Sequence, residues 1–220
     1  MRRRLPLLLG ALLAAAIAVS PAQAASSASC SSSKPAAAGK PKPSFKKPAT
    51  VLAKNKRYAI VMTTTCGTIR IVLDRKLGGA IPNSIAFLAT KHFFDGLTFH
   101  RVVQDFVLQG GDPRGDGTGG PGYEVVGALP SSYHYKLGDI AMAKTQNAPS
   151  GAAGSQFFVI SGAQGAQLPP LYGLLGHAAD AASLATIKRI AALATTACGS
   201  SDCPPSKKVW IVTAKLVTLK

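Results

Sequence analysis

The feature that most limits the fold of this 220-residue chain is a series of short apolar runs between Tyr58 and Leu219. They are rich in β-branched residues, and breaks that contain glycine or proline separate them. Short runs of this kind between turn signals are typical of β-strands. We therefore predict strands at 58–63, 68–73, 98–103, 106–110, 139–143, 156–160, 173–177 and 209–219. A mainly β domain of this kind removes its exposed edges by closing into an antiparallel barrel.

Two segments depart from the strand pattern and are predicted to be helical. Pro82 suits the first turn of a helix that runs to about Lys91, because proline has no N–H to lose there. Asp180 suits the N-cap of a second helix that ends near Leu193, along which apolar residues recur at helical spacing. The expected domain is therefore a β-structure with two helices.

Two further segments precede this domain. Residues 1–24 have the features of a signal peptide: arginines after the first Met, an apolar stretch too short to span a bilayer, and an Ala-Gln-Ala cleavage site. Residues 25–57 consist largely of Ala, Ser, Pro and Lys, so we expect a flexible, extended, basic linker. The folded domain would then be residues 58–220. We expect the mature protein to be exported, and so to be extracellular, periplasmic or associated with the cell envelope.

The formal net charge of +16 is concentrated ahead of the domain. Residues 1–57 hold 11 of the 25 Lys and Arg residues and none of the nine Asp and Glu, which leaves +5 for the rest. Nucleic-acid binding would need basic residues interleaved with aromatics on the folded part, and this pattern is absent, so we expect no nucleic-acid partner. The basic segment is instead suited to tether the protein to anionic envelope polymers or lipid head groups.

If the protein is exported, its four cysteines can form disulfides, because disulfides persist outside the reducing cytosol. Their spacing matches neither a redox motif nor a zinc site, so we expect no metal. Antiparallel pairing of the first and last strands would bring Cys66 near the loop that holds Cys198 and Cys203. We predict that Cys66 pairs with one of these two, with Cys203 slightly favoured. Cys30, which follows the apolar leader, would remain unpaired or carry a lipid anchor.

Common catalytic patterns are absent, including paired carboxylates, a metalloprotease histidine pair and a Gly-x-Ser-x-Gly turn. Residues 117–120 lack the Lys-Ser/Thr of a phosphate-binding loop and are interpreted as a surface turn. The informative residue is Arg101, which lies in an apolar predicted strand. Phe106 and Gln109 follow it in the next predicted strand, and Gln156 begins a later one. A guanidinium beside aromatic walls and two amides suits a neutral polar group, such as a backbone carbonyl, in an apolar cleft. An ion-paired strand arginine is the alternative.

A set of motifs, in a fixed order along the chain, is more specific than the residues around Arg101. They are Pro82–Phe87, Phe99–Asp112, Gly117–Gly120, Ile140–Ala143, Gly154–Val159 and Leu171–Gly176. Together they resemble the motifs of the cyclophilins, a family of peptidyl-prolyl cis-trans isomerases, over about residues 58–219. The resemblance implies a closed eight-stranded antiparallel β-barrel capped by two α-helices, with the active site in a surface groove.

The resemblance also implies the site residues. Arg101 resembles the catalytic arginine, Gln109 the amide that orients it, and Phe106 an aromatic wall of the proline pocket. The remaining substrate-binding positions implied by it are Val107, Gly117, Ala143, Lys144, Gln156, Phe158, Leu168 and Tyr172. No cofactor and no metal are implied, and the partners are proline-containing polypeptides.

The implied function is rotation of X–Pro bonds in exported proteins, without a covalent intermediate and with Arg101 stabilising the twisted amide. One alternative is a chaperone or holdase that captures proline-containing segments with little turnover. Another is an envelope-interaction protein in which the basic segment carries the function.

We expect a monomer, because there is no heptad pattern and no exposed apolar stripe. Gln167, Tyr172 and Lys144 depart from the residues usual in the family, so we expect weak cyclosporin binding and a different substrate preference.

Overall fold

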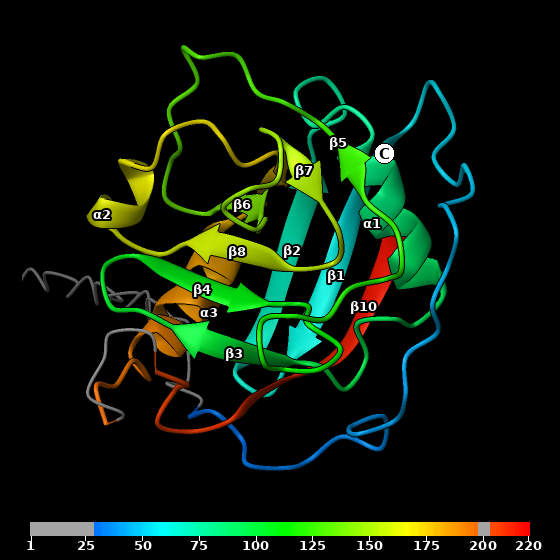
Figure 1. The fold of residues 1–220 in the computed structure, drawn as a ribbon. Helices are drawn as coiled ribbons and strands as arrows, with labels where there is room; N and C mark the ends of the chain where they lie inside the picture. Colours follow the sequence, from blue (N-terminus) through cyan, green and yellow to red (C-terminus); the bar gives the residue numbers. More distant parts are fainter. Residues whose placement is uncertain (1–28, 198–202) are drawn as a thin grey trace, which may run out of the picture.

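Ten strands occur within the residues that the structure, a computed structural model, describes, which are 29–197 and 203–220. They are β1 (Arg57–Thr64), β2 (Gly67–Leu73), β3 (Thr98–Val102), β4 (Val107–Gly110), β5 (Val125–Val126), β6 (Asp139–Met142), β7 (Ala152–Ala153), β8 (Phe157–Ile160), β9 (Leu174–Ala178) and β10 (Val209–Leu219). Eight of them close a barrel in the order β1-β10-β3-β4-β8-β6-β9-β2 (Figure 1), and every pair in it is antiparallel. The predicted eight-stranded barrel is thereby confirmed.

The first and last strands of the barrel pair with each other, as predicted. The register runs from Arg57 opposite Leu219 to Thr64 opposite Ile211, with an irregularity after Thr63. The other edge of β1 pairs with β2. Because β10 also pairs with β3, the two ends of the domain sequence are tied into one continuous ladder with no free edge.

The described residues contain three helices, α1 (Ile81–Thr90), α2 (Ala163–Ala166) and α3 (Ala181–Ala191). The two predicted helices are α1, with proline in its first turn, and α3, whose N-cap Asp180 accepts a hydrogen bond from the Ser183 N–H at 2.7 Å. The four-residue α2 and the small β5–β7 sheet were not predicted, because such short elements show no periodicity. None of the described helices is long and apolar enough to cross a bilayer.

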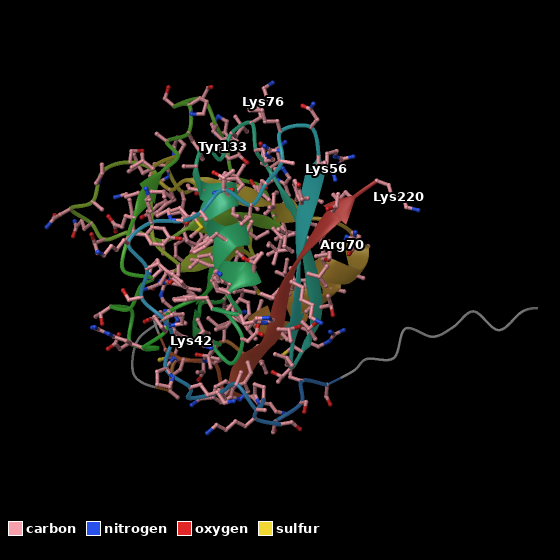
Figure 2. All side chains as sticks on the ribbon, turned by 90° about the vertical axis from the view of Figure 1, so that its right-hand side faces the viewer. Lys42, Lys56, Arg70, Lys76, Tyr133 and Lys220 are labelled. Carbon is pink, nitrogen blue, oxygen red and sulfur yellow. A yellow bond between two sulfur atoms is a disulfide. The ribbon has the colours of Figure 1, made fainter. Side chains whose placement is uncertain are left out.

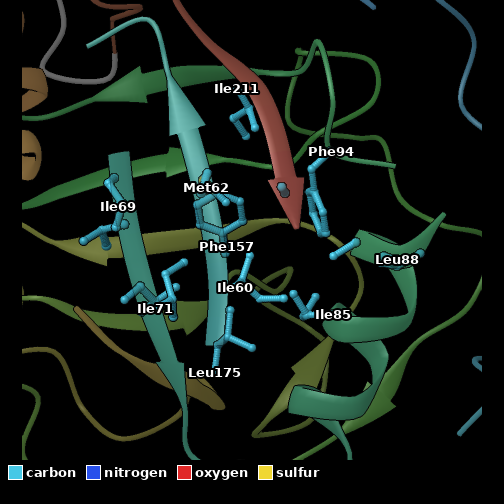
Figure 3. Close-up of a cluster of buried hydrophobic side chains, with 14 of the residues drawn as sticks. Ile60, Met62, Ile69, Ile71, Ile85, Leu88, Phe94, Phe157, Leu175 and Ile211 are labelled. Atoms are coloured by element: carbon cyan, nitrogen blue, oxygen red, sulfur yellow. The ribbon is translucent and has the colours of Figure 1, made fainter. Parts of the chain in front are cut away.

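Alternating side chains of the barrel strands point inward and form the core with the inner face of α1 (Figure 3). Ile69 and Ile71 of β2 are both 1% exposed, and Ile85 and Leu88 of α1 pack toward the same interior. The ring of Phe157 fills the centre with edge-on contacts to two further phenylalanines at 5.7 and 6.2 Å. The core therefore fixes β8, which also forms part of the site described below.

Residues 29–56, which we call the strap, correct the expectation of a free, flexible linker. The segment is extended and contains no helix or strand, but it packs along the barrel and past α1 (Figures 1 and 2). The ring of Phe45 lies edge-on to that of Phe87 at 5.1 Å. The side-chain oxygen of Asn83 accepts hydrogen bonds from the backbone of the strap, the shorter from Val51 at 2.9 Å. The folded unit therefore includes the strap, and the boundary at residue 58 is too late in the chain.

A disulfide between Cys30 and Cys66 anchors the beginning of the strap, with 4.1 Å between the two Cα atoms. The prediction that Cys66 pairs with Cys203 or Cys198 is wrong. The antiparallel pairing does bring the start of β10 near Cys66, but the strap passes closer to the β1–β2 turn. The Ser31 N–H donates to the Thr65 carbonyl at 2.7 Å, which holds Cys30 beside its partner.

The disulfide also bears on the other cysteines. A sulfur bonded to another sulfur cannot carry a lipid thioether, so this structure excludes the lipid anchor considered for Cys30. Cys203 is itself disulfide-bonded and fully buried. Cys198 lies outside the described residues.

Replacing both Cys30 and Cys66 with serine should lower the free energy of unfolding by about 4 kcal/mol. The bond joins residues 36 positions apart, so its loss restores the conformational freedom of that loop to the unfolded chain. Urea denaturation followed by far-UV circular dichroism measures the difference. A change smaller than about 0.5 kcal/mol would show that the strap does not depend on this bond.

Candidate active site

The neighbouring strands β3 and β4 place the two residues at the centre of the candidate site. Arg101 on β3 lies opposite Gln109 on β4, and its Nη1 donates a hydrogen bond to the Gln109 Oε1 at 3.5 Å. An irregularity in the pairing between Phe99 and Arg101 re-aims the strand at this point. Both side chains are half-buried, so each can be oriented by the protein and still reach a ligand.

A relay of amide hydrogen bonds continues from Gln109 to the next loop. The Gln109 Nε2 donates to the Gln156 Oε1 at 3.1 Å. The Gln156 Nε2 in turn donates to the carbonyls of Gly117 at 2.8 Å and Gly119 at 2.9 Å. The guanidinium of Arg101 is therefore linked through two side-chain amides to a backbone loop, and this linkage restricts its orientation.

A second group of predicted residues forms an apolar wall next to the arginine. Val107 and Phe158 are buried in one hydrophobic cluster, against which three half-buried side chains pack, those of Phe106, Leu168 and Tyr172. The rings of Phe158 and Tyr172 meet edge-on at 5.2 Å. The Arg101 guanidinium carbon lies 5.6 Å from the centre of the Phe106 ring. A cation and an apolar surface of ring size therefore lie side by side.

The ammonium group of Lys144 makes hydrogen bonds and a ring contact within the protein. Its Nζ donates to the carbonyls of Thr145 and Ala148 at 3.2 and 3.0 Å and lies 5.7 Å from the centre of the Tyr172 ring. Ala143 precedes it and donates its N–H to the Gln156 carbonyl at 2.9 Å. The ammonium group thus closes one end of the apolar wall.

A hollow of about 1030 Å³, which we call the main hollow, lies beside these residues. Its walls include five predicted residues, Gln109, Gly117, Ala143, Lys144 and Gln156. They also include Lys42 and Ser44 from the strap, which sequence reasoning missed. The composition of the strap gives no sign of where it lies, so only the disulfide pairing could have revealed its position.

Asp112 is a further supporting residue that sequence reasoning missed. It is 2% exposed, and its carboxylate accepts the N–H of Arg114 at 2.8 Å and that of Gly117 at 2.5 Å. Gly117 has a φ of +87°, and a Cβ at Gly119 would collide with the carboxylate. The Gly-Thr-Gly-Gly sequence is therefore a turn wrapped around a buried acid, in agreement with its interpretation as a turn.

His100, which precedes Arg101 on β3, differs from it in environment. Burial lowers the pKa of the imidazole, and this effect outweighs the opposing influence of the Asp112 carboxylate. The ring is therefore neutral at neutral pH. It adds no charge beside the guanidinium.

Comparisons with known proteins identify the relatives of this chain. Residues 59–216 match the family described as "Cyclophilin type peptidyl-prolyl cis-trans isomerase/CLD". "Probable peptidyl-prolyl cis-trans isomerase B" of Mycobacterium tuberculosis is 34% identical over 175 residues, which are 73% of this chain and 54% of that protein. The protein of the same description in Mycobacterium leprae is 35% identical over 184 residues, 77% of this chain and 58% of that protein. The chain thus spans little more than half the length of these curated relatives.

A solved structure resembles the fold. It is the crystal structure of a cyclophilin type peptidyl-prolyl cis-trans isomerase of Cryptosporidium parvum in the presence of the dipeptide Ala-Pro. It matches with a TM-score of 0.62 and 22% identity, over 74% of this chain and 99% of that one. At this identity the likeness concerns the fold.

Replacing Asp112 with asparagine should destabilise the domain by about 2 kcal/mol at pH 7. The amide would lose the charge of the buried acceptor and turn an N–H group toward one of the two backbone N–H donors. Urea denaturation measures the loss. The matched control is Asp116→Asn in the same loop, because Asp116 is exposed and accepts from Thr118, as an asparagine oxygen also can. Equal effects of the two substitutions would contradict the role given to Asp112.

Proposed function

The chain belongs to the cyclophilin-type peptidyl-prolyl cis-trans isomerase family, as its motifs predicted, and we propose that it accelerates rotation about X–Pro bonds. The observation that carries this proposal is the position of Arg101, linked to Gln109 at 3.5 Å and set beside the ring of Phe106. The site thus offers a hydrogen-bond donor next to an apolar surface. A prolyl residue has the matching chemistry, an apolar ring joined to a peptide carbonyl.

The proposed mechanism follows from the physics of the amide bond. Resonance opposes rotation with a barrier of roughly 18–20 kcal/mol, so the uncatalysed reaction takes on the order of tens of seconds. When the bond is twisted by about 90°, resonance is lost and the proline nitrogen gains a lone pair. A donor that binds this twisted state more strongly than the planar states lowers the barrier. Arg101 is the donor in this proposal.

The other residues have supporting roles in the same proposal. Phe106, Val107, Phe158 and Leu168 hold the proline ring still, so that the remainder of the substrate turns relative to it. The relay from Gln109 to Gln156 keeps the guanidinium oriented before the substrate arrives, which reduces the reorganisation needed in the transition state. No proton is transferred and no covalent bond is formed.

We extend the proposal to exported substrates. Disulfides are rare in the cytosol and common in oxidising compartments, so the Cys30–Cys66 bond supports export of this protein. The leader at residues 1–24, which lies outside the described residues, points the same way. The clients would then be proline-containing polypeptides that fold after export.

Replacing Arg101 with alanine should reduce kcat/KM on a proline-containing peptide roughly 100-fold or more, because the donor to the twisted state is removed. Turnover is measured by NMR exchange between the cis and trans peptide. Arg70→Ala, on the exposed face of β2, is the matched control and should keep full activity. Unchanged turnover in the Arg101 variant would overturn the mechanism. A wild-type protein that binds the peptide without accelerating exchange would instead favour the holdase.

The activity should be independent of pH between about 7 and 8. Burial lowers the pKa of His100 below its ordinary value of 6.5, so the neutral imidazole predominates over this range and the charge next to Arg101 does not change. NMR exchange is suited to this measurement because it needs no coupling enzyme with a pH dependence of its own. A sigmoid change in kcat/KM near pH 6.5 that is absent from His100→Gln would contradict this expectation.

A further inference from the structure

A second hollow lies on the other side of the loop that follows β4. Its volume is about 550 Å³, and residues 112–115 of that loop line it together with three other segments that are far apart in sequence. They are residues 39–41 of the strap, the chain from 96 to 100 that leads into β3, and residues 204–210 at the start of β10. The strap and the approach to β10 both run alongside β3 at this end of the barrel (Figure 1).

The second hollow is separate from the main hollow. The two share only Pro113 and Arg114, which form a partition between them. Gln109 and Gln156 of the candidate active site line the main hollow alone, whereas His100 lines the second hollow alone. A ligand in the second hollow would therefore leave the main hollow open.

The walls of the second hollow are mainly apolar and rigid. Four prolines and the indole of Trp210 contribute to them, and the prolines are Pro41, Pro113, Pro204 and Pro205. Proline and tryptophan have few rotatable bonds, so a ligand that binds here orders little of the protein. A volume between 300 and 1000 Å³ with apolar walls and a few polar groups is typical of sites for small molecules.

The rim of the second hollow carries positive charge. Lys40, Arg114 and Lys208 line it, and the Lys208 Nζ lies 5.3 Å from the centre of the Trp210 ring. None of these three cations forms an ion pair with a carboxylate in the described part of the chain. The one lining acid, Asp112, already accepts two backbone N–H groups. The rim therefore favours an anionic group on the ligand.

One polar atom at the second hollow lacks a partner. The Nδ1 of His100 is buried and has no hydrogen-bond partner among the residues described. A buried polar atom without a partner costs free energy. His100 is also the neighbour of Arg101 on β3, so the base of this hollow and the candidate active site share one strand.

We propose that the second hollow binds a small, flat, apolar molecule that carries an acidic group. The apolar rings would lie against Trp210 and the prolines, with the acid directed to Lys208 at the rim. This site is distinct from the isomerase groove, and the proposal does not rest on the proposed function.

The chain has a single tryptophan, Trp210, which lines this hollow, so its fluorescence responds to a ligand bound there. The probe is 8-anilinonaphthalene-1-sulfonate, which combines apolar rings with an anion. Its neutral relative N-phenyl-1-naphthylamine has nearly the same rings without the acid. We expect saturable one-to-one binding of the anionic dye to the native full chain, with energy transfer from Trp210 to the dye, and at least roughly fivefold weaker binding of the neutral dye.

Two variants locate the dye on the protein. Lys208→Gln should weaken binding roughly fivefold to tenfold, because it removes one cation from the rim. Lys76→Gln is the control, since Lys76 lies at the opposite end of the molecule from the strap around Lys42 (Figure 2), and its Kd should not change. On binding, the side-chain nitrogen signals of His100 should shift, while those of the other three histidines stay in place.

Several results would overturn the proposal. Binding that does not saturate, or equal affinity for the neutral dye, would remove the basis for an acidic ligand. Equal effects of Lys208→Gln and Lys76→Gln would show general attraction to a basic protein. Displacement of the dye by a proline-containing peptide would place it in the candidate active site instead.

Discussion

The pairing of β1 with β10 is the interaction on which the rest of the structure depends. These strands begin and end the barrel domain, and their ladder turns a curved sheet into a closed one. Closure sets β3, β4 and β8 side by side, and these strands carry Arg101, Gln109 and the residues next to Gln156. Closure also places the β1–β2 turn, so that Cys66 meets the strap. It places the start of β10, so that Trp210 borders the second hollow. Both ends of the barrel domain therefore help to position the strap and the second hollow.

The candidate site combines two environments that are difficult to obtain in the same place. A guanidinium needs hydrogen-bond acceptors, whereas a ring-sized apolar pocket must exclude them. The relay through Gln109 and Gln156 supplies the acceptors along one side, and the cluster around Phe158 supplies the apolar surface along the other. Asp112 holds the end of the relay by fixing the glycine-rich turn. The side chain of Arg101 thus has polar amides on one side and an apolar surface on the other.

The fold could be predicted to a large extent from the sequence because strand and helix patterns are local. The alternation in β2 and the proline at the start of α1 predicted the correct elements, and the family motifs named residues that lie together around Arg101 and along the main hollow. The pairing of Cys66 could not be predicted in the same way, because it depends on where an extended segment lies on a finished surface. Lys42 and Ser44 were missed for that reason, since a segment rich in Ala, Pro and Lys has no period that reveals a buried face. Contacts of irregular segments are set by the tertiary structure alone.

The strap has a consequence for how this protein meets other chains. Five lysines between residues 34 and 47 lie on the strap, which is packed against the domain, and two of them line the hollows, Lys42 the main hollow and Lys40 the second. A fixed array of like charges produces a lasting electrostatic potential, which extends into solution over a screening length of about 8 Å at physiological ionic strength. Unfolded chains with acidic stretches would be drawn toward this face before any contact forms. Basic chains would be turned away, so the encounter rate itself would sort substrates by charge and would weaken as salt is added.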